Sequence, residues 1–324
     1  MEYRNLGESD LQVSAVGFGC WETGGEYGDY QDSAVIAAVH RALDLGVTLF
    51  DTARGYGFGR SEELLAEALG AHRKDVVVVS KVGIYKDADG RYRRDSSRAA
   101  LLQGLEQSLR SLHTDFLDLL LVHWPDRTRP VSEAMETLNE IHRSGKARYV
   151  GVSNFHAADL REAAPHAHLV TNQVGYNLFD RRWEHEMFPT AEALGLGVMA
   201  YGPLAHGLLT GGLSHGEQFQ ETDWRARGDV FGQPLLEPDN LPANLAVVEK
   251  LRELAAPLGM SVSQLAIAWV LHDPAVGVAL TGCRTASEIE ENAGAAGRTL
   301  GASTLAAIDE AMTGARGQVS DVMD

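Results

Sequence analysis

The stretch Leu49–Glu63, LFDTARGYGFGRSEE, brings a carboxylate and a phenol to the end of a predicted strand. Its apolar run ends at Asp51, and Tyr56 follows in a glycine-rich turn. A helix is predicted to begin near Ser61, because serine followed by two glutamates is typical of a helix N-terminus. The stretch therefore indicates a strand, a loop and a helix, in that order.

Two later apolar runs also end in polar residues. A run of four valines leads to Lys81, and the run Phe116–Val122 leads to His123. In a parallel α/β barrel the carboxyl ends of the strands meet at one face, and residues placed there are typically catalytic. We therefore expect Asp51, Tyr56, Lys81 and His123 to converge.

Short β-branched runs alternate with amphipathic helical patterns along nearly the whole chain, which favours parallel strands joined by crossover helices. Eight such runs end near Gly19, Asp51, Lys81, His123, Ser153, Gln173, Tyr201 and Thr281. Helices are predicted near 32–45, 61–69, 96–112, 131–144, 157–164, 186–194, 243–256, 261–272, 286–295 and 303–312. The predicted fold is an α/β protein of the (β/α)8 TIM-barrel type.

Two segments stand outside this repeating pattern. Residues 3–13, with a turn at Gly7, are predicted to form an N-terminal β-hairpin that plugs the bottom of the barrel. Residues 205–242 form a long connection after the seventh strand, and loops of that length in a compact domain are usually functional lids. Arg225 and Arg227 in this segment are candidate phosphate clamps, with solvated surface arginines as the alternative.

Length and composition limit the possible classes of protein. The chain has 324 residues, 44% of them hydrophobic, and we expect one domain over 1–324. Its net charge of −17 opposes binding to nucleic acid or an anionic membrane. No apolar run approaches the ~20 residues of a membrane helix, and no secretory signal is apparent, so we expect a cytoplasmic protein. Two cysteines, Cys20 and Cys283, exclude a disulfide scaffold.

Seven motifs, found in order at predicted strand ends, carry a resemblance to a known family. They are FDTARGYGFGRSE, VVVVSK, LLLVHWPD, ARYVGVSNF, NQVGYNLFDR, VMAYGPLAHGLLTG and LTGCRTASEIEEN. The chain resembles the aldo-keto reductase superfamily over nearly its whole length, and it is similar to the bacterial inositol-operon and general-stress members. The resemblance implies a TIM barrel that binds a nicotinamide dinucleotide without a Rossmann domain.

The resemblance also implies that Asp51, Tyr56, Lys81 and His123 are a catalytic tetrad. Carbonyl reduction needs a hydride donor, a proton donor beside the carbonyl oxygen, and groups that stabilise the developing oxyanion. Tyr56 is the expected proton donor, and we expect the Lys81 ammonium to favour its ionised form. Asp51 is expected to balance the charge of Lys81, and His123 is expected to orient the substrate oxygen.

Cofactor contacts are predicted at the later strand ends. Ser153, Asn154 and Gln173 carry hydroxyl and amide groups suited to a nicotinamide carboxamide. The aromatic ring of Tyr201 is suited to stack on the nicotinamide. Gly202 and Leu204, just after this strand, complete that end of the predicted cofactor site.

The other end of the cofactor is predicted at the start of the last barrel helix. Gly282 and Arg284 precede this helix, and helix N-termini bind phosphate through free N–H groups. The resemblance implies that Arg284 meets the 2′-phosphate or adenine, and that Asn292 meets the adenine edge. Glu288 stands where many relatives carry Arg or Gln, and it is expected to repel a phosphate or to accept a ribose hydroxyl. Because of Arg284 we favour NADP, with NAD as the alternative.

The substrate pocket is predicted to contain Trp21, Tyr85 and Trp124, whose rings surround the carbonyl. No metal is expected, because the chain has no H-x-x-x-H motif and no cysteine cluster. The predicted function is NADP(H)-dependent interconversion of an aldehyde, ketone or sugar with its alcohol. The alternatives are an NAD-dependent sugar dehydrogenase and a nucleotide-sensing regulatory subunit similar to potassium-channel β-subunits. The sequence leaves the oligomeric state open.

Overall fold

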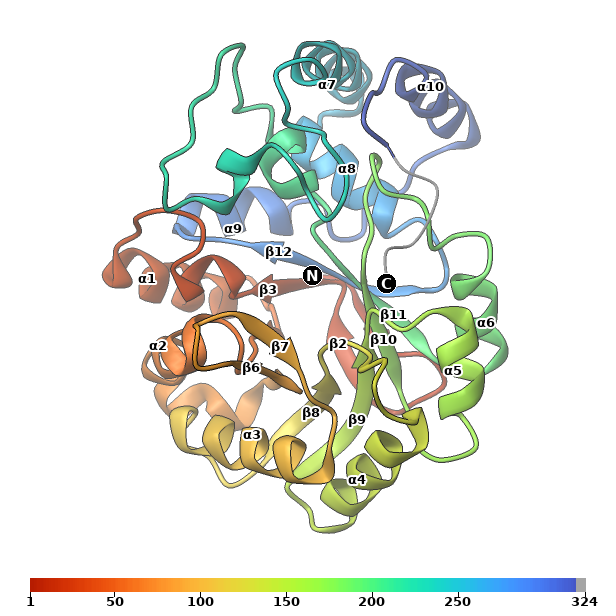
Figure 1. Cartoon of the computed structure of the whole chain (residues 1–324). Helices are drawn as coiled ribbons and strands as arrows, with labels where there is room; N and C mark the ends of the chain where they lie inside the picture. The colour runs from red at the N-terminus through yellow and green to blue at the C-terminus, as the bar shows by residue number, and fades with distance from the viewer. Residues whose placement is uncertain (319–324) are drawn as a thin grey trace.

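The computed structural model describes residues 1–318, and residues 319–324 of the expected domain lie outside the described residues. Eight parallel strands close into a barrel in the order β10-β11-β12-β3-β4-β5-β8-β9, with helices around the outside (Figure 1). This arrangement confirms the predicted α/β TIM barrel. The barrel strands are β3 (Val16–Gly19), β4 (Leu49–Asp51), β5 (Val77–Val82), β8 (Leu117–Val122), β9 (Ala147–Ser153), β10 (Thr171–Gly175), β11 (Gly197–Tyr201) and β12 (Val276–Gly282).

All the predicted helices are present, with bounds that differ from the expected ones by two residues or fewer. They are α1 (Asp32–Asp44), α2 (Arg60–Leu69), α3 (Arg98–Ser111), α4 (Val131–Arg143), α5 (Ala157–Ala163), α6 (Met187–Ala193), α7 (Leu241–Ala255), α8 (Val262–Val270), α9 (Ala286–Ala293) and α10 (Ala302–Met312). Short 3-10 helices lie at η1 (Trp21–Gly24), η2 (Gly57–Gly59), η3 (Gly70–Asp75), η4 (Ala205–Thr210), η5 (Trp224–Arg227) and η6 (Ala256–Leu258).

The N-terminal hairpin is confirmed. Strands β1 (Tyr3–Asn5) and β2 (Gln12–Ser14) pair antiparallel. Three apolar side chains of this segment, Leu6, Leu11 and Val13, are buried in one cluster with side chains from the barrel strands. The hairpin therefore closes one end of the barrel with apolar packing, which leaves the other end for chemistry.

The interior packing determines which polar residues reach that other end. The buried cluster includes Leu49 of β4, Val79 of β5, Leu121 of β8 and Met199 of β11. Because side chains alternate along a strand, the residue two positions later points to the same side. Those residues are Asp51, Lys81, His123 and Tyr201. The alternation thus directs the carboxylate, ammonium, imidazole and phenol toward one rim.

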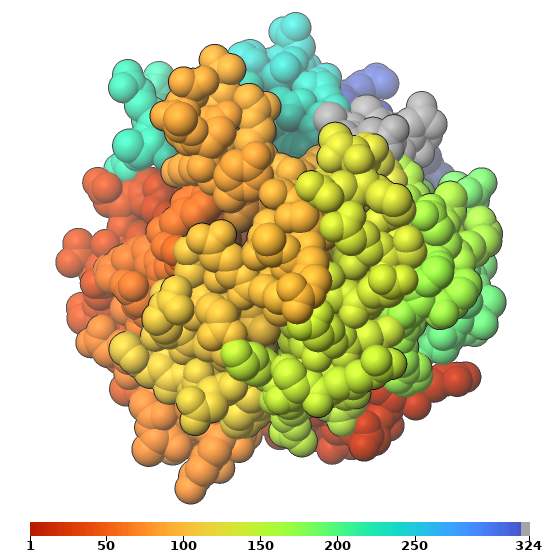
Figure 2. Space-filling view, turned by 60° about the horizontal axis from the view of Figure 1, so that its bottom comes forward, coloured from red at the N-terminus to blue at the C-terminus, as the bar shows by residue number. Residues whose placement is uncertain are grey.

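One element at this rim was not predicted. Strands β6 (Ile84–Lys86) and β7 (Tyr92–Arg94) form an antiparallel hairpin directly after β5. The hairpin belongs to the orange region on the molecular surface in Figure 2. Strongly polar, exposed residues make up most of it, so its sequence lacks the apolar run by which the barrel strands were recognised.

Two further points concern the helices. Helix α2 begins at Arg60, and Ser61 does not cap it; the fully buried Ser61 hydroxyl donates to the carbonyl oxygen of Cys20 at 2.9 Å. Within residues 1–318, no single helix is long and apolar enough to cross a membrane. The segments Leu241–Leu258 and Val262–Val270 meet that criterion only as a pair, which is bent by 88°.

Candidate active site

Four polar side chains meet at the carboxyl end of β4, β5 and β8. The Nζ of Lys81 lies 2.6 Å from Oδ2 of Asp51 and donates a hydrogen bond to the Tyr56 hydroxyl at 2.9 Å. The Nε2 of Gln173 donates to the second Asp51 oxygen at 2.8 Å. The rings of Tyr56 and His123 meet edge to face with their centroids 5.6 Å apart. The structure therefore brings the predicted tetrad together.

Burial controls the protonation of these groups. Burial and the Asp51 anion raise the pKa of Tyr56 well above its ordinary value, so the phenol is protonated. Lys81 donates a hydrogen bond to this hydroxyl, but burial sets the net direction of the pKa shift. Burial also lowers the pKa of Lys81, and Asp51 opposes that shift. Burial, Lys81 and Arg94 lower the pKa of His123 well below its usual range, so its imidazole is neutral.

Most of the predicted site residues line one cavity of about 870 Å³ at this end of the barrel. They are Trp21, Asp51, Tyr56, His123, Trp124, Ser153, Asn154, Gln173, Tyr201, Gly202, Leu204, Gly282, Arg284 and Glu288. The cavity thus extends from the tetrad to the start of α9.

Three predicted site residues do not line the cavity. Lys81 is only 1% exposed and contacts Tyr56 from the protein interior. Tyr85 lies on the outer face of β6 with 44% exposure, whereas its neighbour Ile84 and the hairpin residue Tyr92 do line the cavity. Asn292 is buried, and its Nδ2 lies 3.4 Å from the sulfur of Cys283.

The residues predicted at the nicotinamide end form a connected network. The Tyr201 hydroxyl donates to Oδ1 of Asn154 at 3.0 Å. The Nδ2 of Asn154 donates to Oγ of Ser153 at 3.0 Å and to the carbonyl oxygen of His123 at 3.1 Å. These contacts hold the polar floor of the cavity in one arrangement beside the tetrad.

The start of α9 is already capped by its own carboxylate. Oε2 of Glu288 accepts hydrogen bonds from the backbone N–H groups of Arg284 and Thr285, at 2.6 and 3.1 Å. The Arg284 guanidinium donates to the carbonyl oxygen of Tyr27 at 3.3 Å. Glu288 thus closes a capping box and places a negative charge at a helix N-terminus, where an anion is normally attracted.

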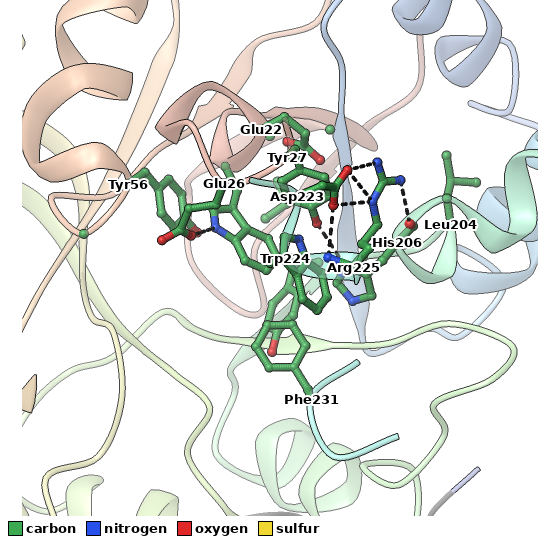
Figure 3. Close-up of a pocket in the computed structure, with 18 of the residues that line it drawn as sticks. Glu22, Glu26, Tyr27, Tyr56, Leu204, His206, Asp223, Trp224, Arg225 and Phe231 are labelled. Atoms are coloured by element: carbon green, nitrogen blue, oxygen red, sulfur yellow. Dashed lines mark hydrogen bonds and ion pairs between the residues drawn. The ribbon is translucent and has the colours of Figure 1, made fainter. Parts of the chain in front are cut away.

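The long connection after β11 covers the cavity. Its residue Arg225 forms a salt bridge to Asp223 at 2.6 Å and donates to the carbonyl oxygen of His206 at 3.3 Å, as the dashed lines in Figure 3 show. The indole of Trp224 stacks on Trp21 with ring centroids 5.2 Å apart. Arg225 is therefore a structural anchor of the lid rather than a solvated arginine.

Several cavity residues were not found from the sequence. They are Glu22, Glu26, Tyr27, Tyr92, His206, Trp224 and Phe231. Trp21 donates from Nε1 to Glu26 at 2.9 Å, and Tyr92 hydrogen-bonds the same carboxylate, so the β6–β7 hairpin is tied to η1. Because these residues come from loops and a short hairpin, the strand-end rule gives no signal for them. For Trp224 and Phe231 the signal in the sequence is the aromatic content of the long connection.

We expect Arg225→Gln to release the lid, because Asp223 is buried and would lose its ionic partner. Loss of a hydrogen bond to a charged group costs roughly 1.5–3 kcal/mol, which corresponds to about a tenfold or greater increase in the open population. Limited proteolysis within residues 213–234 measures this increase. Arg227→Gln is the matched control, since Arg227 is exposed. Equal cleavage rates in the two variants would contradict the anchoring role.

Comparison with known proteins agrees with this geometry. The model of the Aldo/keto reductase family matches residues 15–313. The aldo-keto reductase YhdN of Bacillus subtilis is 34% identical over 303 residues, which cover 93% of this chain and 90% of that protein. A probable voltage-gated potassium channel subunit beta of Oryza sativa is 34% identical, covering 90% of each chain. The structure of the glycerol dehydrogenase AKR11B4 from Gluconobacter oxydans matches with a TM-score of 0.87 and 32% identity, covering 99% of this chain and 97% of that one.

The chain belongs to the aldo/keto reductase family, and it is an oxidoreductase that acts on carbonyl and alcohol groups. Members of this family use nicotinamide cofactors. Within residues 1–318, no group of three or more His, Cys, Asp or Glu side chains is arranged to hold a metal ion.

Proposed function

We propose that this protein reversibly reduces a small carbonyl compound with a nicotinamide dinucleotide, with Tyr56 as the general acid and base. The observation that carries the proposal is the 2.9 Å hydrogen bond from Lys81 to the Tyr56 hydroxyl, at the edge of a cavity large enough for a dinucleotide. When bound, the nicotinamide supplies the hydride or accepts it. The protein supplies the proton and the electrostatic environment.

Tyr56 is protonated at neutral pH and can therefore give its proton to a carbonyl oxygen as negative charge develops there. The phenolate that remains is stabilised by the hydrogen bond and the positive charge of Lys81, which Asp51 holds in position. In the direction of alcohol oxidation, the same phenolate accepts the proton of the alcohol. Lys81 thus contacts the resting phenol and interacts more strongly with the phenolate that proton transfer leaves.

His123 is suited to orient the substrate oxygen. Its imidazole is neutral, so one ring nitrogen can donate without adding a second cation beside Lys81. Its Nδ1 is buried and has no hydrogen-bond partner among the described residues. Trp21 and Trp224 stack beside Tyr56 and limit the access of water to this point, which strengthens each electrostatic contact.

The cavity residues fit a nicotinamide dinucleotide. Tyr201 offers an aromatic face, and Asn154 and Gln173 offer amide groups, beside Tyr56. Arg284 had favoured NADP(H), whereas the contacts of Glu288 now support NAD(H), because this carboxylate binds the N–H groups of Arg284 and Thr285 and places a negative charge beside any phosphate at the start of α9. We therefore propose NAD(H) as the preferred cofactor.

A polyol, a hydroxyaldehyde or a sugar is the substrate class that we propose. The matched glycerol dehydrogenase supports it, and so do the aromatic rings of Trp21 and Trp124, which are suited to pack on sugar carbons. We place the reaction in the cytoplasm, where free thiols such as the buried Cys20 and Cys283 stay reduced.

The test is a hydride-transfer assay with both reduced nucleotides and a panel of glyceraldehyde, dihydroxyacetone and aldoses, with glycerol and inositols for the reverse direction. We expect steady turnover with at least one carbonyl, and at least about tenfold tighter binding of NADH than of NADPH, because like charges at the phosphate position are repulsive. Quenching of tryptophan fluorescence reports the binding, since Trp21, Trp124 and Trp224 line the cavity. Nucleotide binding without hydride transfer to any carbonyl would contradict the proposal.

The similarity to a plant potassium-channel subunit beta supports a second candidate, a nucleotide-sensing regulatory subunit. The intact tetrad supports catalysis instead. The two candidates differ in the fate of the nucleotide: a sensor retains it after purification and transfers hydride very slowly, whereas an enzyme exchanges it with each turnover. Stopped-flow measurement of a single hydride transfer, followed by nucleotide release, separates them.

A further inference from the structure

The carboxylate of Glu22 occupies the space that a side chain at position 282 would fill if this residue were not glycine. Glu22 lies in η1 just after β3, and Gly282 ends the neighbouring strand β12. A Cβ built on Gly282 would overlap the carboxylate of Glu22. Both residues line the cavity, and Figure 3 shows Glu22 beside Tyr27 at the side of the cavity away from Phe231. Glu22 therefore presents its carboxylate at the end of β12, where α9 begins.

This carboxylate has no dedicated partner within the protein. Among residues 1–318, no other residue donates a hydrogen bond to it within ordinary distance. The nearest cations are Arg284 and Arg225, but Arg225 is bound to Asp223. A partly buried carboxylate that keeps its acceptor capacity is suited to a ligand that donates hydrogen bonds.

Glu22 and Glu288 together make this end of the cavity acidic. Both line the cavity, and of the two cations that act on Glu22, Arg284 and Arg225, the second is bound to Asp223. Glu288 also accepts hydrogen bonds from the N–H groups of Arg284 and Thr285, just before α9. A phosphate dianion placed here would meet two carboxylates, whereas a hydroxyl would find two acceptors.

We propose that Glu22 is a specificity-determining residue that accepts a hydrogen bond from a ribose hydroxyl of the dinucleotide and repels a phosphate at that position. Glu22 therefore favours NAD(H) over NADP(H). It belongs to η1, whereas Glu288 belongs to α9, and its side chain reaches the site through the space that Gly282 leaves open. The inference rests on the proposed function, since it concerns the nucleotide that the same cavity holds.

The selection depends on pH. Burial, more than any other factor, raises the pKa of Glu22 to about 7, with Glu288 raising it further and Arg284 and Arg225 lowering it. The other titratable groups that sense its charge are Cys20, Tyr27, Tyr56 and Cys283. Above this pKa the group is a carboxylate and repels phosphate; below it the group is a neutral acid, and the repulsion fades. Discrimination against NADPH should therefore increase as the pH rises through 7.

The test compares the dissociation constants of NADH and NADPH by tryptophan fluorescence in the wild type and in Glu22→Gln. At about pH 8.5 we expect the NADPH-to-NADH ratio to fall about tenfold in Glu22→Gln, mainly through tighter NADPH binding. At about pH 6 the two proteins should differ little, because Glu22 is then largely protonated. The 2′-phosphate itself loses a proton near pH 6 in both proteins, so the difference between them isolates Glu22.

Glu290→Gln is the matched control, because Glu290 lies on α9 but is exposed and paired with Arg41 at 2.6 Å. It should leave the ratio unchanged. Glu22→Ala provides a second variant, and thermal melting checks that each variant is folded. An unchanged ratio in folded Glu22→Gln and Glu22→Ala, or a wild-type ratio with the same pH dependence as Glu22→Gln, would overturn the inference and leave the proposed function standing. Failure of both nucleotides to bind the wild type would instead overturn the proposed function.

Discussion

Tyr56→Phe is expected to slow carbonyl reduction by about three orders of magnitude, within the range that a general acid contributes. The variant loses only the hydroxyl that lies 2.9 Å from Lys81, and its ring still packs against Trp21 and His123. Nucleotide affinity should therefore change by less than about threefold, since no charge is added or removed. Single-turnover hydride transfer and fluorescence titration measure the two quantities separately.

Tyr149→Phe is the matched control for this experiment. The Tyr149 hydroxyl donates to Asp10 at 2.6 Å, beside the N-terminal hairpin and at the opposite end of the barrel. Its removal should leave hydride transfer unchanged. Turnover by Tyr56→Phe within several-fold of the wild type would exclude the phenol as the proton donor.

Lys81→Met is expected to destabilise the folded protein by about 3–5 kcal/mol, because it leaves the buried Asp51 carboxylate without its ionic partner. Activity should fall as well, since the Tyr56 hydroxyl loses the cation that stabilises its phenolate. Urea unfolding measures the change in the free energy of unfolding. The size of the effect follows from the depth of the pair, because an exposed salt bridge contributes only ~1 kcal/mol or less.

The double variant Lys81→Met with Asp51→Asn distinguishes two causes of the lost stability, a buried unpaired charge and a loss of packing. Asparagine can still accept a hydrogen bond from Gln173, which now donates to Asp51 at 2.8 Å. Part of the lost stability should return in the double variant but none of the activity. If Lys81→Met were as stable as the wild type, the Lys81–Asp51 pair would have to be solvated, contrary to its burial in the structure.

The barrel and the tetrad were predictable from the sequence for a simple physical reason. A strand buried on both faces is apolar throughout, so an Asp, Lys or His at its end is conspicuous. The two-residue alternation from Leu49 to Asp51 and from Val79 to Lys81 then directs those side chains inward. Both signals are local, and a single sequence contains them.

The lid and the hairpin over the cavity were less predictable, because their positions depend on contacts between distant segments. Trp224 lies over Trp21 only because its backbone N–H donates to the carbonyl oxygen of Glu26 at 2.9 Å. Tyr85 was assigned to the substrate pocket from its place in the chain, but β6 turns it outward and β7 brings Tyr92 instead. The net rise in the pKa of Tyr56 was not predicted either, because it depends on how deeply the phenol is buried.

The apolar hairpin at the amino end of the barrel has a kinetic consequence. Because Leu6, Leu11 and Val13 fill that end, nucleotide and substrate have to pass the same rim, beneath the segment that Asp223 and Arg225 anchor. Because both ligands use the same opening of the cavity, the exchange of one depends on whether the other is bound. We expect a dinucleotide that spans the cavity from Tyr56 to α9 to bind before the smaller molecule and to leave after it.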